Sequence, residues 1–237
     1  MNISLRHYFF IVLSLLLIIT FTNQCSKSNK IKEGTIEYDI SYPCLEKSSN
    51  SLMFFLPKKM ITTFKDDCFK NEFIFSNPNS KLEAISNCIS KDITLAFGYG
   101  KSMKYTKLDS SSIHILLDEL PTYSKVSSSV DSVNYLDNSS LCYDVSSSKS
   151  DSIFKITSTK EIEINNMNWC TPFNKINEVM LEYKLNQYGI EMKFKATKIN
   201  KIKVDNDFLE LDPNYSFLKV KKYLKEVKGI LSIFSCQ

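Results

Sequence analysis

The amino-acid sequence predicts a mainly β domain with some helix: an open antiparallel sheet covered by a C-terminal helix and one or two short helices. Three observations lead to this prediction. Apolar and polar side chains alternate strictly in residues 34–42, and they alternate again on both arms of a hairpin in residues 179–197. After residue 217 the apolar positions recur every three or four residues instead, which indicates an α-helix.

The first strand is predicted from residues 34–42, Gly-Thr-Ile-Glu-Tyr-Asp-Ile-Ser-Tyr. A period of two with one polar face is typical of an antiparallel strand that packs on a core with its other face. The polar face carries Thr35, Glu37, Asp39 and Ser41. The apolar face carries Ile36, Tyr38, Ile40 and Tyr42.

The late hairpin turns at residues 186–189, Asn-Gln-Tyr-Gly. Acidic and lysine side chains share its polar face, as expected for cross-strand neighbours on a solvated surface. Its apolar positions are Val179, Leu181, Tyr183 and Leu185 before the turn, and Ile190, Met192, Phe194 and Ala196 after it.

Several shorter strands and one short helix complete the predicted domain. A helix is expected in residues 113–120, because Pro121 ends a helix at the residue before it. A hairpin is expected from residues 52–56 and 60–65, which flank Pro57-Lys58-Lys59. Further strands are expected at 71–76, 92–99, 102–107, 153–156 and 162–164, while three serine-rich stretches (110–112, 127–129 and 146–150) indicate loops.

The C-terminal helix carries one apolar stripe, with lysines between its members. Asp212 and Pro213 supply a cap and a first helical position. Such a helix after a sheet is expected to cover the sheet, and its lysine-rich face also fits a helix that lies in a membrane interface. The stripe consists of Phe217, Val220, Leu224, Val227, Leu231 and Phe234.

The N-terminus has the pattern of an export signal. Residues 8–21 are almost wholly apolar, a run of about 14 residues, which suits a signal peptide better than a membrane span of about 20. The predicted organisation is a signal peptide (1–24), a polar tether (25–33) and a single β-rich domain (34–237). Cys25 and the polar residues after it resemble a bacterial lipoprotein signal, which implies lipidation of Cys25, membrane anchoring and a location in the cell envelope, at the outer membrane or facing the periplasm. Ordinary secretion with cleavage near Thr22 is the alternative.

Composition and motifs exclude several functions. The charge of +4 comes from interspersed lysines and acids, so nucleic-acid binding is not expected. There is no nucleotide-binding, zinc-protease or serine-hydrolase motif, and His114 is the only histidine after the leader, so no enzyme, metal site or cofactor is predicted. The six cysteines beyond Cys25 allow up to three disulfides or buried free thiols. The sequence does not set the oligomeric state.

A family resemblance rests on three segments: residues 33–42, the block from Trp169 through the late hairpin, and residues 204–208 leading to Pro213 and Tyr215. They resemble exported proteins common in Bacteroidetes that are similar to periplasmic lipoprotein carriers of the LolA/LolB type. The resemblance implies a half-open antiparallel β-barrel with helices at its mouth and an apolar cavity that shields a lipid or acyl chain. The alternative is a structural or interaction protein of the envelope with a filled core. Strand alternation supplies the candidate lining residues: Ile36, Tyr38, Ile40, Tyr42, Leu181, Tyr183, Leu185, Met192 and Phe194.

Overall fold

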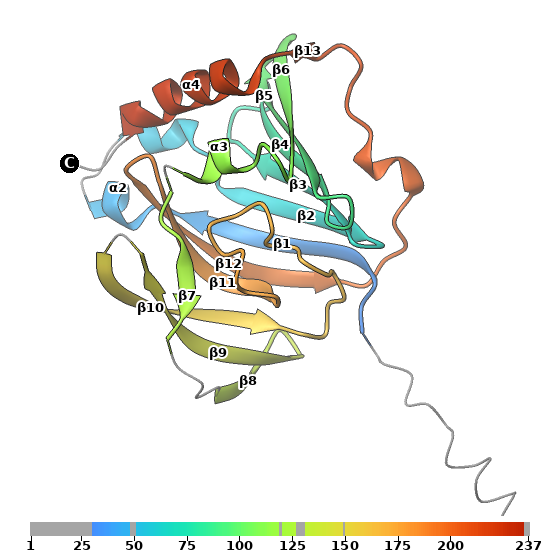
Figure 1. The fold of residues 1–237 in the computed structure, drawn as a ribbon, viewed down its shortest axis with the longest axis vertical. Helices are drawn as coiled ribbons and strands as arrows, with labels where there is room; N and C mark the ends of the chain where they lie inside the picture. The colour runs from blue at the N-terminus through green and yellow to red at the C-terminus, as the bar shows by residue number, and fades with distance from the viewer. Residues whose placement is uncertain (1–29, 48–50, 119, 127–130, 149, 235–237) are drawn as a thin grey trace, which may run out of the picture. The chain divides into compact units, whose positions relative to one another are not determined.

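The computed structural model describes residues 30–47, 51–118, 120–126, 131–148 and 150–234. Residues 31–237 form one compact unit, in which thirteen strands make a single curved sheet that does not close on itself (Figure 1). The predicted fold class, a mainly β curved sheet with a C-terminal helix, is confirmed. In chain order the strands are β1 (Glu33–Ser41), β2 (Lys59–Lys65), β3 (Cys68–Ile74), β4 (Ser80–Asn87), β5 (Asp92–Tyr99), β6 (Ser102–Asp109), β7 (Tyr123–Lys125), β8 (Asp131–Tyr135), β9 (Asn138–Ser147), β10 (Ser150–Thr159), β11 (Val179–Gln187), β12 (Ile190–Asn200) and β13 (Ser216–Phe217).

The strand order joins two meanders through the first strand. Strands β2 to β6 follow one another on one side of β1, while β12, β11, β10 and β9 follow on the other. These neighbours are antiparallel, and the short β13 pairs with β6 in parallel at one edge. β7 and β8 both pair with β9 at the other edge. Because β1 pairs with β12, the first strand and the last long strand of the domain meet in the middle of the sheet.

Tight turns fix the register of the central hairpins. Tyr188 and Gly189 connect β11 to β12, with φ of 52° and 83°. Positive φ at both central residues is the type I′ geometry that matches the twist of a hairpin. Asp66 and Asp67 connect β2 to β3 with φ of 48° and 61° in the same way. Both hairpins, β11–β12 and β2–β3, are therefore closed by two-residue turns of this type.

The predicted alternation of buried and more exposed side chains in β1 is confirmed. Gly34, Ile36, Tyr38 and Ile40 are buried, whereas the residues between them are half-buried or exposed. The same face of the neighbouring strands adds Phe64 and Phe69 from β2 and β3 and Leu181 and Phe194 from β11 and β12, so that one core runs across the middle of the sheet.

Three covers lie on or beside the concave face of the sheet: α3 (His114–Leu117), the segment 160–178, and α4 (Val220–Leu231) (Figure 1). Ile162, Ile164 and Trp169 from the segment 160–178 pack on the core of β1 to β3. Trp169 is buried, and its Nε1 donates a hydrogen bond to Ser86 Oγ over 3.0 Å. The remaining short helices are α2 (Pro43–Lys47) and the 3₁₀ turns η1 (Ser51–Phe55), η2 (Asn206–Leu209) and η3 (Ser232–Phe234).

Four local predictions are wrong. Residues 51–55 form the 3₁₀ helix η1 instead of a strand. Ile162 makes only an isolated bridge with Ile31, so 162–164 is no strand. The C-terminal helix begins at Val220 instead of Pro213, because Phe217 joins the sheet as part of β13. In the serine-rich stretch predicted as a loop at 146–150, Ser146 and Ser147 are paired residues of β9 and Ser150 begins β10.

The start of the compact unit, the state of the cysteines and the length of the helices can be compared with the sequence-based expectations. Ile31 is buried and β1 begins at Glu33, so the compact unit starts three residues before the predicted boundary at Gly34. Cys44 is disulfide-bonded, whereas Cys68, Cys88, Cys142 and Cys170 are free. Within the described ranges, no helix has the length and apolar character needed to cross a membrane. Cys25 and the predicted signal peptide lie outside the described residues.

Candidate ligand-binding groove

Helix α4 covers part of the concave face and leaves unfilled space on both of its sides. One cavity has a volume of about 260 Å³ and the other of about 500 Å³. Both are bordered by the sheet and by the apolar side of α4. We call the two cavities together the α4 groove. Ligand sites in proteins occupy about 300–1,000 Å³ and are mostly apolar, so the groove has the size of a small-molecule site.

The 260 Å³ cavity lies between α4, α3 and the segment 160–178. Its floor is formed by the concave face of β1 to β5 together with β11 and β12. Its upper wall on α4 includes Tyr223 and Leu224, and its side wall includes Leu116 on α3 and Met167 in the segment 160–178. Tyr223 is buried, and its ring meets Phe97 edge to face at 4.9 Å between centroids. This contact attaches α4 to the middle of the sheet.

The 500 Å³ cavity lies on the other side of α4, toward η1 and the ends of β4 to β6. Phe97 and Met192 form part of its floor, and Ile230 forms part of its α4 wall. Phe55 from η1 borders it as well, and Phe55 and Ile230 are 59% and 47% exposed. Large apolar side chains that remain exposed next to a cavity indicate that the cavity opens to solvent at this end.

The two cavities share part of their walls and are therefore neighbours along one groove. The shared residues come from four strands of one face (β3, β4, β11 and β12) and from two positions on α4. Val227 and Leu231 lie one turn apart on the helix and separate the two spaces. The full shared set is Phe73, Leu82, Leu185, Gln187, Phe194, Val227 and Leu231.

Two tyrosines in the walls, Tyr38 and Tyr42, present apolar rings because their hydroxyls are bonded within the protein. Tyr38 donates its hydroxyl proton to the carbonyl of Met180 over 2.9 Å, and Tyr42 donates to the carbonyl of Pro57 over 2.7 Å. Burial raises the pKa of both phenols, so they stay neutral. The Tyr183 ring stacks on Phe194 at 4.8 Å with an interplanar angle of 7°. These rings give the floor a smooth apolar surface.

The structure places six of the nine candidate lining residues at the walls of the groove. Tyr38 and Tyr183 border the 260 Å³ cavity, Tyr42 and Met192 border the 500 Å³ cavity, and Leu185 and Phe194 border both. The other three, Ile36, Ile40 and Leu181, are buried in the core and border neither cavity. They share the face of the sheet, but other residues cover them.

Sequence reasoning missed the half of the floor that β3 to β5 supply, and it named no lining residue on α4. The signal for the missed strands was present, because Leu82 and Ala84 alternate with Lys81 and Glu83 as strictly as the residues of β1 do. Both apolar residues border the 260 Å³ cavity. On α4, the predicted stripe contains Leu224, Val227 and Leu231, which do line the groove.

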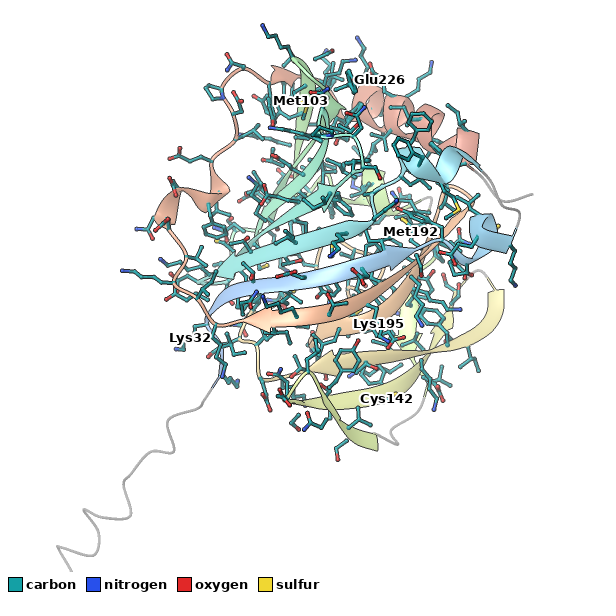
Figure 2. The ribbon with its side chains drawn as sticks, turned by 180° about the vertical axis from the view of Figure 1, so that it is seen from behind. Lys32, Met103, Cys142, Met192, Lys195 and Glu226 are labelled. Carbon is teal, nitrogen blue, oxygen red and sulfur yellow. The ribbon has the colours of Figure 1, made fainter. Side chains whose placement is uncertain are left out.

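Charged groups border the two cavities unequally. Lys104 on β6 forms an ion pair with Glu226 on α4, with 2.7 Å between Nζ and Oε2. Both residues border the 500 Å³ cavity. Figure 2 shows Glu226 on α4 next to the strand that carries Met103. Lys81 and Glu83 of β4 alternate with Leu82 and Ala84 and point to the opposite face, where Glu83 pairs with Lys70, so no charged side chain of the described residues faces the 260 Å³ cavity.

No other cluster in the described part of the chain has the composition of a catalytic or metal site. The described ranges contain no group of three or more His, Cys, Asp or Glu side chains that could hold a metal ion. His114 is exposed on α3. Cys88 and Cys170 are buried, and burial raises the pKa of the Cys170 thiol to about 12, so this thiol is protonated at neutral pH.

Comparisons with known proteins add little. No family model matches the chain, and no curated protein matches it. A solved structure of PNGF-II is similar to it over 82% of this chain and 32% of that chain, with 13% sequence identity and a TM-score of 0.49. At this level of similarity the likeness carries no argument about function.

Proposed function

We propose that this chain is an envelope lipoprotein that binds one hydrophobic molecule, a lipid or the acyl chain of a lipoprotein, in the α4 groove. The observation that carries the proposal is the pair of adjoining cavities of about 260 and 500 Å³ between α4 and the apolar concave face. Each methylene removed from water contributes about 0.8 kcal/mol. An extended acyl chain in the groove would therefore gain affinity along its whole length.

Three further features support a ligand in this place over a simple packing defect. The walls combine flexible Leu and Met side chains with aromatic rings, and the hydroxyls of Tyr38 and Tyr42 are hydrogen-bonded to backbone carbonyls of the protein. The cover is an amphipathic helix, so a change in the position of one element would open the groove. The exposed side chains of Phe55 and Ile230 border the open end, where an apolar ligand would enter.

The resemblance to LolA/LolB-type carriers belongs to the same proposal. A curved open sheet with helices at its mouth is the architecture that this resemblance implies, and lipidation of Cys25 would hold the domain near its ligands at a membrane. Intact-mass analysis of the chain purified from a membrane fraction tests the anchor: cleavage before Cys25 with added acyl mass is expected. An unmodified N-terminus near Thr22 would contradict it.

Binding itself is tested by titrating the purified chain with a fluorescent fatty acid and by native mass spectrometry without detergent. Saturable binding at one site is expected. Met192→Trp, which adds a ring in the 500 Å³ cavity, should weaken binding about tenfold or more, since the side chain takes the space of the ligand. Lys195→Trp is the matched control, because Lys195 is exposed on the same strand (Figure 2).

The outcome separates this proposal from a structural protein. Absence of saturable binding to the unmodified chain, or equal binding to both Trp variants, would contradict a ligand in the groove and favour an interaction protein without a guest. The prediction that the chain is no enzyme is kept as part of the proposal. A substrate turned over by the purified chain would overturn that part.

A further inference from the structure

The charges around the α4 groove give it a direction. Lys104 is the one cation, among the described residues, whose side chain lies on the floor of the 500 Å³ cavity, where it pairs with Glu226 on α4. Lys81 and Glu83 alternate with Leu82 and Ala84 on β4 and point to the opposite face, where the Glu83 carboxylate pairs with Lys70. The 500 Å³ cavity therefore offers a cation to a head group, whereas the 260 Å³ cavity, which we call the inner cavity, offers no charge on its walls within the described ranges.

Polar side chains on the floor of the 500 Å³ cavity lie side by side in the sheet. Ser80 on β4 and Ser102 on β6 both pair with Tyr99 of the intervening strand β5, so all three are in one cross-strand row. The next row on the same face holds Leu82, Phe97 and Lys104. All six residues border the cavity. Within the described residues neither serine hydroxyl makes a side-chain hydrogen bond, so both are available to a ligand.

Resting on the proposed function, we infer that the ligand is a single-chain lipid with an anionic head group, bound head outward. The ammonium of Lys104 binds the head group, and the hydroxyls of Ser80 and Ser102 are placed to donate to it. The tail lies between Phe97, Met192 and Phe194 and continues past Val227 into the inner cavity. A carboxylate and a phosphate monoester share this chemistry, since both offer several acceptor oxygens to an ammonium.

Glu226 is the internal competitor for this position. Its Oε2 lies 2.7 Å from Lys104 Nζ, and the Glu226 and Lys104 side chains are 29% and 35% exposed. An incoming anion that takes the place of Glu226 on Lys104 breaks the ion pair between α4 and β6. Head-group binding is thereby coupled to the attachment of the helix that covers the tail. An uncharged lipid cannot replace the Glu226 carboxylate in the ion pair with Lys104.

The test compares three ligands with the same chain: dodecanoate, dodecyl phosphate and 1-dodecanol, measured by displacement of a fluorescent probe from the full purified chain. Both anions are expected to bind about tenfold more tightly than the alcohol. Lys104→Met should remove that preference, so that the two anions and the alcohol bind with similar affinity. Glu226→Gln should strengthen binding of the anions several-fold, because their competitor is gone.

Lys107→Met is the matched control, because Lys107 is an exposed lysine of the same strand that borders neither cavity of the groove. It should leave all three affinities unchanged. Equal binding of the anions and the alcohol to the unmodified chain, or a preference that survives Lys104→Met, would overturn the inference while the proposed function stands. No binding of any of the three would instead remove the proposed function. A preference for only one of the two anions identifies the head group.

Discussion

Two regions of the same concave face are closed in different ways. Under β7, β9, β10 and β11 the face is covered by a cluster of buried side chains, which we call the filled cluster; only Phe173 and Met180 of it also border the 260 Å³ cavity. Under α4 the face remains partly empty. Both regions are made of strands with comparable alternation, so the sheet itself does not decide which one holds space. The filled cluster consists of Tyr123, Tyr143, Val145, Ile156, Phe173, Ile176 and Met180.

The covers of the two regions account for the difference. The filled cluster is closed by the irregular segment 160–178, whose Phe173 stacks on Tyr123 at 4.5 Å and is only 1% exposed. Asn168 fixes that segment by donating to the carbonyls of Ile176 and Glu178 over 2.8 and 3.0 Å. An irregular chain can follow the surface below it, whereas a rigid helix such as α4 meets a curved sheet at a few points only.

The largest expected effect comes from removing the ring that fills the cluster. Phe173→Ala should lower the free energy of unfolding by about 3–5 kcal/mol, since it removes a fully buried aromatic side chain and leaves a cavity. Urea denaturation monitored by far-UV circular dichroism measures it. Val227→Ala in the wall of the groove is the counterpart and should cost about 1 kcal/mol or less, because space already exists beside it. Equal losses would show that the two regions are packed alike.

Substitutions that enlarge a side chain test the same difference between the filled cluster and the groove, with smaller expected effects. Val145→Phe in the filled cluster should cost about 1–3 kcal/mol, because Val145 is fully buried and has no room for a ring. Val227→Phe should change the free energy of unfolding by less than about 1 kcal/mol, because its ring can enter the groove. The same denaturation experiment measures both. A large loss on Val227→Phe would mean that the groove is filled in solution.

Sequence reasoning located the groove only in part, for a physical reason. Alternation identifies which face of a strand is apolar, and it did so correctly for β1, β11 and β12. It does not tell which part of that face a distant segment will cover. Ile36 and Leu181 have the same pattern as Tyr183 and Leu185, yet packing from elsewhere in the chain closes the first two.

The predicted bounds of helices and strands are wrong where one sequence pattern fits two kinds of secondary structure. The short apolar run in residues 52–56 fits a strand or a helical turn equally, and in the structure 51–55 is a 3₁₀ turn. Phe217 fits the helical stripe of α4, but pairing with Tyr105 on β6 places it in the sheet, where the two rings meet at 5.5 Å. Long-range pairing of this kind leaves no mark in the local sequence.

The ion pair beside the filled cluster, Lys125–Glu178, has a more buried carboxylate than the ion pair of the groove, Lys104–Glu226. Glu178, beside the filled cluster, accepts hydrogen bonds from Lys125 Nζ at both carboxylate oxygens over 2.9 Å, and its side chain is 9% exposed. Burial acts to raise the pKa of this carboxyl, but the hydrogen bond from Lys125, its own backbone amide and the charges of Lys125 and Lys160 lower it below the ordinary value.

The lowered pKa of Glu178 predicts an acid-sensitive contribution to stability. Because the folded-state pKa lies below the unfolded one, the contribution is present above the unfolded value near 4.5 and is lost as pH falls through the folded pKa. Glu178→Gln should therefore destabilise the protein at neutral pH and reduce the loss of unfolding free energy on acidification. Urea titrations at about pH 7, 5, 4 and 3 measure it. Parallel pH curves for the two proteins would contradict the assignment.

The smallest expected effect is at the ion pair of the groove. Lys104 and Glu226 are each about one third exposed, at 35% and 29%, so solvent screens their attraction and the pair contributes less than about 1 kcal/mol. Lys104→Met should accordingly leave the free energy of unfolding nearly unchanged. A loss above about 2 kcal/mol would mean that the pair attaches α4 to β6 far more firmly than an exposed ion pair does. Such an attachment would make the groove a fixed feature of the fold and would leave Glu226 unable to yield its place to a ligand.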